Sequence, residues 1–179
     1  MGTIFIAGIY GVGKSTLCAC LSKKMGIAAF SAGDLISSVN GEQYGVNKTV
    51  TDKNSNQDIL ISEVHRLLKS NSTILLAGHF CILDNNNNID FLPRSVFSSL
   101  NIEKILLLEA NIVKIMANLY CRDRKVYMQE KVSILQKSER EMAQDVSKKL
   151  GCDLYVHEMS FNNDDILRCF SYIKGGNQR

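Results

Sequence analysis

The sequence has no pair of cysteines spaced as C-x-x-C, although it contains six cysteines. This absence removes the ligand spacing of common zinc sites and of thioredoxin-like redox sites. Several of the cysteines fall within apolar stretches, where cysteine behaves as a small buried hydrophobe. We therefore expect reduced core thiols and a cytoplasmic location.

Long apolar runs and long basic runs are also missing. No apolar stretch approaches the roughly 20 residues that a membrane-spanning helix needs. The first apolar run has no basic region ahead of it, so we expect neither a signal peptide nor a membrane partner. The formal net charge is only +3 and no continuous Lys/Arg run occurs, so we predict no nucleic-acid partner.

Neither an internal repeat nor a linker divides the 179 residues. We predict one domain over residues 1–174 and a frayed tail at 175–179. Short β-rich runs alternate with amphipathic stretches, which indicates an α/β fold whose parallel sheet is covered by helices on both faces. Residues 40–54 predict a mobile loop, and the asparagines at 85–88 predict a solvated turn or, alternatively, a substrate loop. The predicted strands cover residues 3–7, 28–31, 73–77, 104–108 and 152–157, and the predicted helices cover residues 14–25, 33–39, 55–69, 93–100, 111–121, 131–150 and 164–174.

Residues 8–15 read GIYGVGKS and fit the pattern G-x-x-x-x-G-K-[ST] without a gap. Glycines let successive backbone N–H groups turn toward one anion, and the helix that follows adds its positive dipole end. The Lys14 ammonium can reach the outer phosphates, and the Ser15 hydroxyl can bind Mg²⁺ directly. The motif predicts a site for ATP and Mg²⁺ with a catalytic Lys14. The expected nucleotide contacts are Gly8, Gly11, Val12, Gly13, Lys14, Ser15 and Thr16.

Two large classes of P-loop protein lack their signatures here. A GTPase carries an N-K-x-D guanine motif, whereas Asn47-Lys48-Thr49-Val50 lacks the Asp and comes too early. A motor ATPase usually has an apolar strand that ends in Asp-Glu, whereas the strand at 73–77 leads into Gly78-His79 without an acid. A small kinase remains, and we predict an ATP-dependent phosphotransferase with nucleotide substrates.

The order of the motifs resembles the archaeal-type adenylate kinases and their eukaryotic nuclear relatives. The matching segments are residues 8–16, Ser31-Ala32-Gly33-Asp34-Leu35, Gly78-His79, Arg122-Asp123-Arg124 and Arg140. This resemblance implies a P-loop NTPase fold with strand order 2-3-1-4-5, an acceptor-binding segment at about 32–70 and a small lid at about 122–130. It also implies transfer of the ATP γ-phosphate to a nucleoside or deoxynucleoside monophosphate.

Three arginines are candidates for phosphate contacts in the lid. An arginine is permanently charged, and its planar fork can bind phosphate through two hydrogen bonds. We expect Arg122, Arg124 and Arg140 to act as catalytic residues that hold the phosphates when the lid closes and excludes water. The alternative is that the charged residues at 122–125 form a solvated helix end.

Three further residues are candidates for the acceptor side. Asp34 can hold a Mg²⁺-bound water or the surroundings of the acceptor phosphate, or it can simply cap a helix N-terminus. His79 follows a strand at the expected cleft and can contact the acceptor, although a lone histidine is often structural. Arg94 is a candidate contact to the acceptor phosphate.

The chain departs from the family in two places, and this leaves other functions open. Archaeal-type adenylate kinases usually have Asp where this chain has Ala77, and they often have an Arg where it has Ile36-Ser37-Ser38. The acceptor could therefore differ from AMP. One alternative is a kinase of a small non-nucleotide acceptor with Asp34 as the general base. Another is a nucleotide-binding switch or assembly protein with weak ATPase activity.

Overall fold

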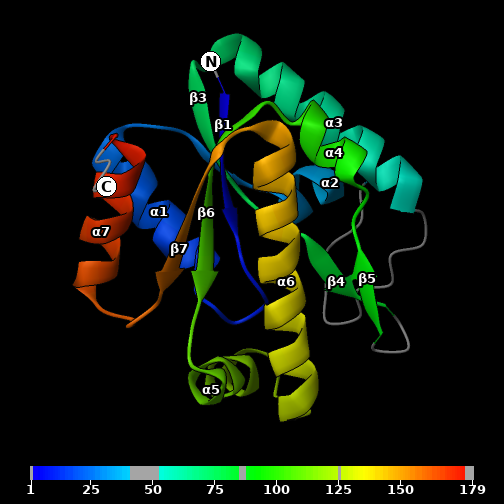
Figure 1. Cartoon of the computed structure of the whole chain (residues 1–179). Helices are drawn as coiled ribbons and strands as arrows, with labels where there is room; N and C mark the ends of the chain where they lie inside the picture. The colour runs from blue at the N-terminus through cyan, green and yellow to red at the C-terminus, as the bar shows by residue number, and fades with distance from the viewer. Residues whose placement is uncertain (1, 41–52, 85–87, 125, 176–179) are drawn as a thin grey trace.

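The computed structural model describes residues 2–40, 53–84, 88–124 and 126–175. Most of the predicted loop at 40–54, most of the asparagine run and the predicted tail beyond Gly175 lie outside these residues. The described residues form one α/β assembly around a central sheet, shown nearly edge-on in Figure 1.

The central sheet has five strands, and all of its pairings are parallel. Its spatial order is β2-β3-β1-β6-β7. Numbered within this sheet alone, that order is the predicted 2-3-1-4-5. The strands are β1 (Gly2–Ala7), β2 (Ala29–Ser31), β3 (Thr73–Ala77), β6 (Ile102–Glu109) and β7 (Asp153–Glu158).

The middle of the sheet forms the hydrophobic core. All of β1 is buried, as are Ile74–Ala77 of β3 and Ile105–Glu109 of β6. Strands that are apolar on both faces need helices above and below them, and this is why their sequences run apolar without alternation. Phe5 of β1 lies opposite Leu76 and Ile105 in the register of its two neighbours.

Helices cover both faces of the sheet (Figure 1). One face carries α1 (Lys14–Met25) and α7 (Asn163–Ile173), and the other carries α3 (Lys53–Ser70), α4 (Arg94–Ser99) and α6 (Gln129–Leu150). Helix α1 ends at Met25 as predicted, and the next residue, Gly26, takes a left-handed conformation in which its N–H donates to the Ser22 carbonyl. No helix in the described ranges is both long enough and apolar enough to cross a membrane.

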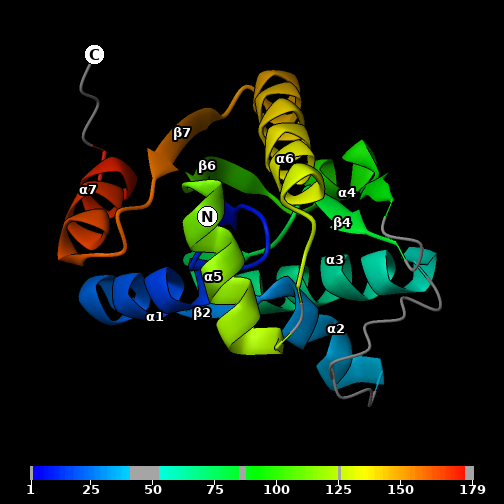
Figure 2. The same ribbon diagram turned by 90° about the horizontal axis from the view of Figure 1, so that it is seen from below.

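Two helices lie near the carboxyl ends of the strands and frame the region where a ligand is expected. Helix α2 (Ala32–Asn40) packs against α3, and α5 (Ile112–Asp123) lies across the end of the sheet, as Figure 2 shows from below. Ligands of open parallel sheets bind outside the carboxyl ends of the strands. The fold therefore leaves this edge for the site.

Two features differ from the sequence-based expectation. An antiparallel hairpin of β4 (Cys81–Leu83) and β5 (Ile89–Phe91) flanks the asparagine run, where the sequence predicts a solvated turn or a substrate loop without strands. Its strands have three residues each, too few to show a period. Helix α5 also extends to Asp123, so Arg122 lies in its last turn and not beyond the helix end predicted at residue 121.

Candidate active site

A cavity of about 780 Å³ opens at the carboxyl edge of the sheet. Lys14, Ser15 and Thr16 line one part of it, and Gly78 and His79 line the centre beside them. The rest of the lining comes from the β2–α2 junction, α3, the β4–β5 hairpin and α4, together with Phe5 of β1, part of α5 and the segment between β7 and α7. This volume is typical of small-molecule sites.

The loop between β1 and α1 has a backbone that only glycine adopts readily. Gly8, Gly11 and Gly13 have φ angles of 142°, 79° and 98°. A Cβ on Gly8 would lie 2.5 Å from the Leu108 carbonyl oxygen, and one on Gly11 would lie 2.9 Å from Leu119 Cγ. These positions therefore require glycine for two reasons, the backbone angle and the space.

Lys14 begins α1 and folds back over this loop. Its Nζ donates to the carbonyl oxygens of Gly8 at 2.6 Å and Ile9 at 3.0 Å. The ammonium thus lies over the concave side of a loop that precedes a helix N-terminus, which is a favourable place for an anion. Ser15 and Thr16 follow on the first turn and line the same cavity. The geometry fits the triphosphate of a nucleotide.

A second loop, between β7 and α7, lies against the phosphate loop. A Cβ on Gly13 would meet Met159 Cε at 3.3 Å and the Phe161 ring at 3.6 Å. Asp165 holds this second loop, because its carboxylate accepts from the Ser160 N–H, the Asn162 N–H and the ring of His157.

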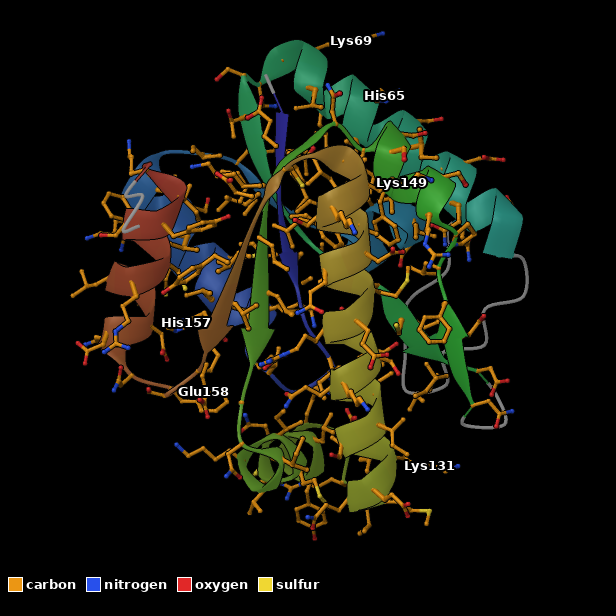
Figure 3. All side chains as sticks on the ribbon, in the orientation of Figure 1. His65, Lys69, Lys131, Lys149, His157 and Glu158 are labelled. Atoms are coloured by element: carbon orange, nitrogen blue, oxygen red, sulfur yellow. The ribbon has the colours of Figure 1, made fainter. Side chains whose placement is uncertain are left out.

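Burial acts to raise the pKa of Asp165, but these hydrogen bonds together lower it below its usual value. His157 is 4% exposed and lies between β7 and α7 in Figure 3, whereas His65 lies on α3 toward the opposite end of the molecule. The pair of His157 and Asp165 therefore serves to shape the wall beside the phosphate loop.

Two contacts connect the phosphate loop with the segment that follows β3. The ring of Tyr10 lies against His79, with centroids 4.3 Å apart and planes at 42°. Below them, the Glu139 carboxylate of α6 accepts from the N–H groups of Gly8, Phe80 and Cys81 at 2.8 to 3.1 Å. The sequence analysis missed both contacts.

A signal for Glu139 existed in the sequence. The buried positions of α6 follow a helical stripe, and Glu139 lies on it between Leu135 and Met142. A carboxylate on the apolar face of an amphipathic helix is unusual unless it has partners. The family resemblance points instead to the neighbouring Arg140.

The three lid arginines occupy different environments. Arg122 lines the cavity, and its guanidinium pairs with the neighbouring Asp123, which also accepts from the Tyr127 hydroxyl. The hydrogen bond to Asp123 raises the pKa of Arg122 above its ordinary value. Arg124 caps α5 in a left-handed conformation and is exposed. Arg140 makes a two-pronged ion pair with Glu109 at the end of β6.

The three candidates for the acceptor side also differ in whether they line the cavity. His79 lines the cavity, but Arg94 pairs with Asp145 on the exposed side of α4 and does not border it. Asp34 is exposed in the first turn of α2 and also lies outside the lining, although Ser31, Ala32 and Gly33 belong to it. The Ser31 hydroxyl accepts from the Asp34 N–H at 3.4 Å.

The remaining wall is largely apolar. It combines aliphatic and aromatic side chains with a few neutral polar groups from α3. Among the described lining residues, Lys14 and Arg122 are the only cations and Asp165 is the only carboxylate. The apolar members of this acceptor wall are Phe5, Ile36, Leu60, Ile82, Leu83, Leu92, Val96, Phe97 and Leu100.

Mg²⁺ prefers oxygen ligands and usually keeps several waters beside substrate phosphates. Ser15 is placed to offer a hydroxyl next to the phosphate loop. No group of three or more potential metal-binding side chains occurs in the described ranges. The residues fit a Mg²⁺ ion that is held mainly by nucleotide phosphates and water, with Ser15 as the protein ligand.

The sequence profile of the AAA-domain family matches residues 7–134, which is more than half of the chain and includes the phosphate loop, α2, α3 and the start of α6. The chain belongs to this family. No curated protein matches the AAA-domain chain in sequence.

Several solved structures share the fold of this AAA-domain protein across nearly the whole chain. Shikimate kinase from Acinetobacter baumannii, solved with shikimate, is 13% identical with a TM-score of 0.63, covering 100% of this chain and 96% of that one. The tunicamycin resistance protein of Deinococcus radiodurans is 13% identical with a TM-score of 0.68, covering 97% and 95%. A gluconokinase from Sinorhizobium meliloti 1021 is 11% identical with a TM-score of 0.55, covering 96% and 93%. The chain therefore has the fold of P-loop kinases.

Proposed function

We propose that this protein is an ATP-dependent phosphotransferase that acts on a small acceptor. One observation carries this proposal: a single cavity is lined by the phosphate loop at one part and by the apolar acceptor wall at another. Donor and acceptor could thus bind side by side without an intervening wall. Proximity of this kind is the main requirement for phosphoryl transfer.

The residues around the phosphates supply charge and orientation rather than covalent chemistry. Bound Mg²⁺ would neutralise part of the charge on ATP, with Ser15 as its protein ligand and Asp34 proposed to act only through water. Lys14 and the N-terminus of α1 stabilise negative charge on the phosphates. Arg122 adds a second cation at the cavity once it exchanges Asp123 for a phosphate. Arg124 and Arg140 would contact the phosphates only in a closed conformation of the lid that brings their guanidinium groups to the cavity.

The first candidate acceptor is a nucleoside monophosphate. Its phosphate oxygen is already an anion and attacks without a general base, because the transition state of phosphoryl transfer is loose. This agrees with an acceptor wall that, over the described residues, carries no carboxylate. The resemblance at the β2–α2 junction and at Gly78-His79 also supports adenylate kinase-type chemistry.

The second candidate acceptor is a small alcohol without a phosphate. The described part of the acceptor wall carries no Lys or Arg to bind an acceptor phosphate, and Arg94 is paired elsewhere. The structural neighbours include kinases of two different non-nucleotide substrates by their names. In this case His79 would accept the proton of the alcohol, since Asp34 lies outside the lining.

A panel of acceptors tests the proposal. Purified protein with Mg-ATP is given each nucleoside or deoxynucleoside monophosphate and a set of small sugar acids and cyclic alcohols, and ADP release is measured. We expect one class to accelerate ADP release well above the rate without acceptor. ATP hydrolysis that no acceptor accelerates would contradict the phosphotransferase and would favour a nucleotide-binding switch.

A further inference from the structure

Glu139 joins two parts of the site that are far apart in the sequence. Its Oε1 accepts from the Gly8 N–H at 3.1 Å, across 131 residues. Both of its oxygens accept from the Phe80 N–H, at 2.9 and 3.0 Å, and Oε2 also accepts from the Cys81 N–H at 2.8 Å. One carboxylate, 1% exposed, therefore connects the start of the phosphate loop with the segment after β3.

Both of these segments lead directly to the reacting groups. Gly8 begins the loop that carries Lys14, and Phe80 follows His79, which lines the cavity. The Phe80 ring is locked between Phe5 and Phe97, at centroid distances of 5.1 and 4.7 Å. A shift of the Glu139 carboxylate would therefore move the phosphate loop relative to His79, because the other side of the His79 segment is fixed by packing.

We propose that Glu139 is a positioning residue for phosphoryl transfer, whose carboxylate holds the phosphate loop and the His79 segment at a fixed separation. This inference rests on the proposed function. A carboxylate suits the task because both of its oxygens accept hydrogen bonds. A glutamine of the same shape would point an NH₂ group at one of the N–H donors.

The surroundings of Glu139 in the folded protein also change its protonation equilibrium. Burial raises the pKa of Glu139 to about 6, and it outweighs the opposing effects of the backbone N–H groups and of Lys14. The native state thus binds a proton more tightly than the unfolded chain, so this group's contribution to stability falls as the pH rises through about 6.

The test compares Glu139→Gln with Glu141→Gln, the same chemical change two residues away on α6. The Glu141 side chain is 62% exposed, and among the ion pairs of the described residues it has one with Lys137 at 3.9 Å. Folding is checked by thermal melting and circular dichroism. ATP hydrolysis without acceptor, transfer to the acceptor from the panel, and calorimetric binding of Mg-AMPPNP are then measured from pH 5 to 9.

We expect Glu139→Gln to bind Mg-AMPPNP within about fivefold of the wild type but to lose about 10- to 100-fold in kcat for hydrolysis and transfer, since small misplacements of reacting groups have effects of this size. Glu141→Gln should keep the wild-type kcat. An equal kcat in both folded variants would overturn the proposal. If no acceptor is phosphorylated, the proposed function fails, but acceptor-free hydrolysis still compares the two variants.

The pH profile separates positioning from a purely structural role. Wild-type kcat should fall on the acid side with an apparent pKa near 6, and the part of this fall that Glu139 causes should be absent in Glu139→Gln. Lys14 faces the carboxylate from the phosphate loop, His79 adjoins Phe80, and burial keeps the Cys81 thiol protonated by raising its pKa. All three remain in the variant, as does the titrating ATP phosphate. Because these groups can leave an acid limb in both proteins, an acid limb in Glu139→Gln with the same midpoint and size as in the wild type would contradict the proposal.

A measurement on the wild type covers the case in which Glu139→Gln fails to fold. The backbone amide signals of Gly8, Phe80 and Cys81 are followed by NMR during titration and during addition of Mg-AMPPNP. We expect one shared transition near pH 6 and a shift of all three signals on nucleotide binding. Separate transitions, or a nucleotide response confined to Gly8, would overturn the proposal.

Discussion

Gly78 connects β3 to His79, and replacing it by alanine should destabilise the protein measurably. A Cβ at this position would lie 2.7 Å from Cε2 and Cζ of Phe5. The Phe5 ring is 1% exposed and packs against the rings of Phe80 and Phe97, so a displacement of Phe5 disturbs this aromatic cluster. Overpacking of this kind costs about 1–3 kcal/mol.

For a chain of this length, each kcal/mol lowers the melting temperature by about 2–4 °C. We therefore expect Gly78→Ala to melt roughly 2–12 °C below the wild type in differential scanning calorimetry. Gly33→Ala is the matched control, because Gly33 lies in α2 and its new Cβ would meet, among the described residues, only Ser31 Oγ at 3.7 Å. This control should be neutral or gain up to about 1 kcal/mol from helix propensity. Equal melting temperatures for the two variants would refute the packing argument.

Three further predictions concern the chemistry of the cavity. Ser15→Ala should raise the Mg²⁺ concentration needed for half-maximal ATP turnover. Asp34→Asn should change that concentration by no more than about threefold, because Asp34 lies outside the cavity lining. A larger effect of Asp34→Asn in a Mg²⁺ titration would contradict this placement. Arg122→Ala should lower kcat by about 10- to 100-fold with little change in the Kd of ATP, because this factor corresponds to the loss of one charge-assisted hydrogen bond in the transition state. Arg124→Ala should keep a kcat near that of the wild type unless the lid closes far enough to bring Arg124 to the cavity. Steady-state kinetics and calorimetry measure the two quantities, and unchanged turnover in Arg122→Ala removes Arg122 from the mechanism. His79→Asn should lower kcat less than about tenfold with a nucleoside monophosphate, but by about 10² to 10⁴ with an alcohol that needs a base. A larger loss with the monophosphate than with the alcohol would contradict the role of His79 as the base for an alcohol.

Much of the fold follows from local sequence patterns. The buried strands show as short apolar runs, and α1 and α6 end close to the predicted residues 25 and 150, where Gly26 and Gly151 adopt left-handed conformations. The phosphate loop is equally local, because its glycines, Lys14 and Ser15 are consecutive. Such features can be read from sequence since each depends on neighbours within one or two turns.

The contacts that complete the site are not local, and this is why the sequence analysis missed them. Glu139 meets Gly8 and Phe80 only after α6 packs beside the sheet. Met159 reaches Gly13 because β7 lies next to β6 at the sheet edge. In each case a residue's role depends on tertiary packing across more than 50 positions in the chain.

The ion-pair partners of the predicted phosphate-binding arginines are also set by tertiary packing. Arg94 and Arg140 are predicted to contact phosphates, but the fold gives each a carboxylate partner, Asp145 and Glu109. A positive charge in a sequence does not reveal which acid will face it. Arg122 also has such a partner, yet it alone of these three borders the cavity.

Calorimetric titration of the wild-type protein with Mg-ATP tests the central claim most directly. The account predicts saturable one-to-one binding that Lys14→Ala abolishes in a variant that still melts cooperatively, because the ammonium and the glycine backbone act on the same phosphates. Well-folded wild-type protein that gives no heat of association, or a Lys14→Ala variant that binds Mg-ATP as tightly as the wild type, would contradict it.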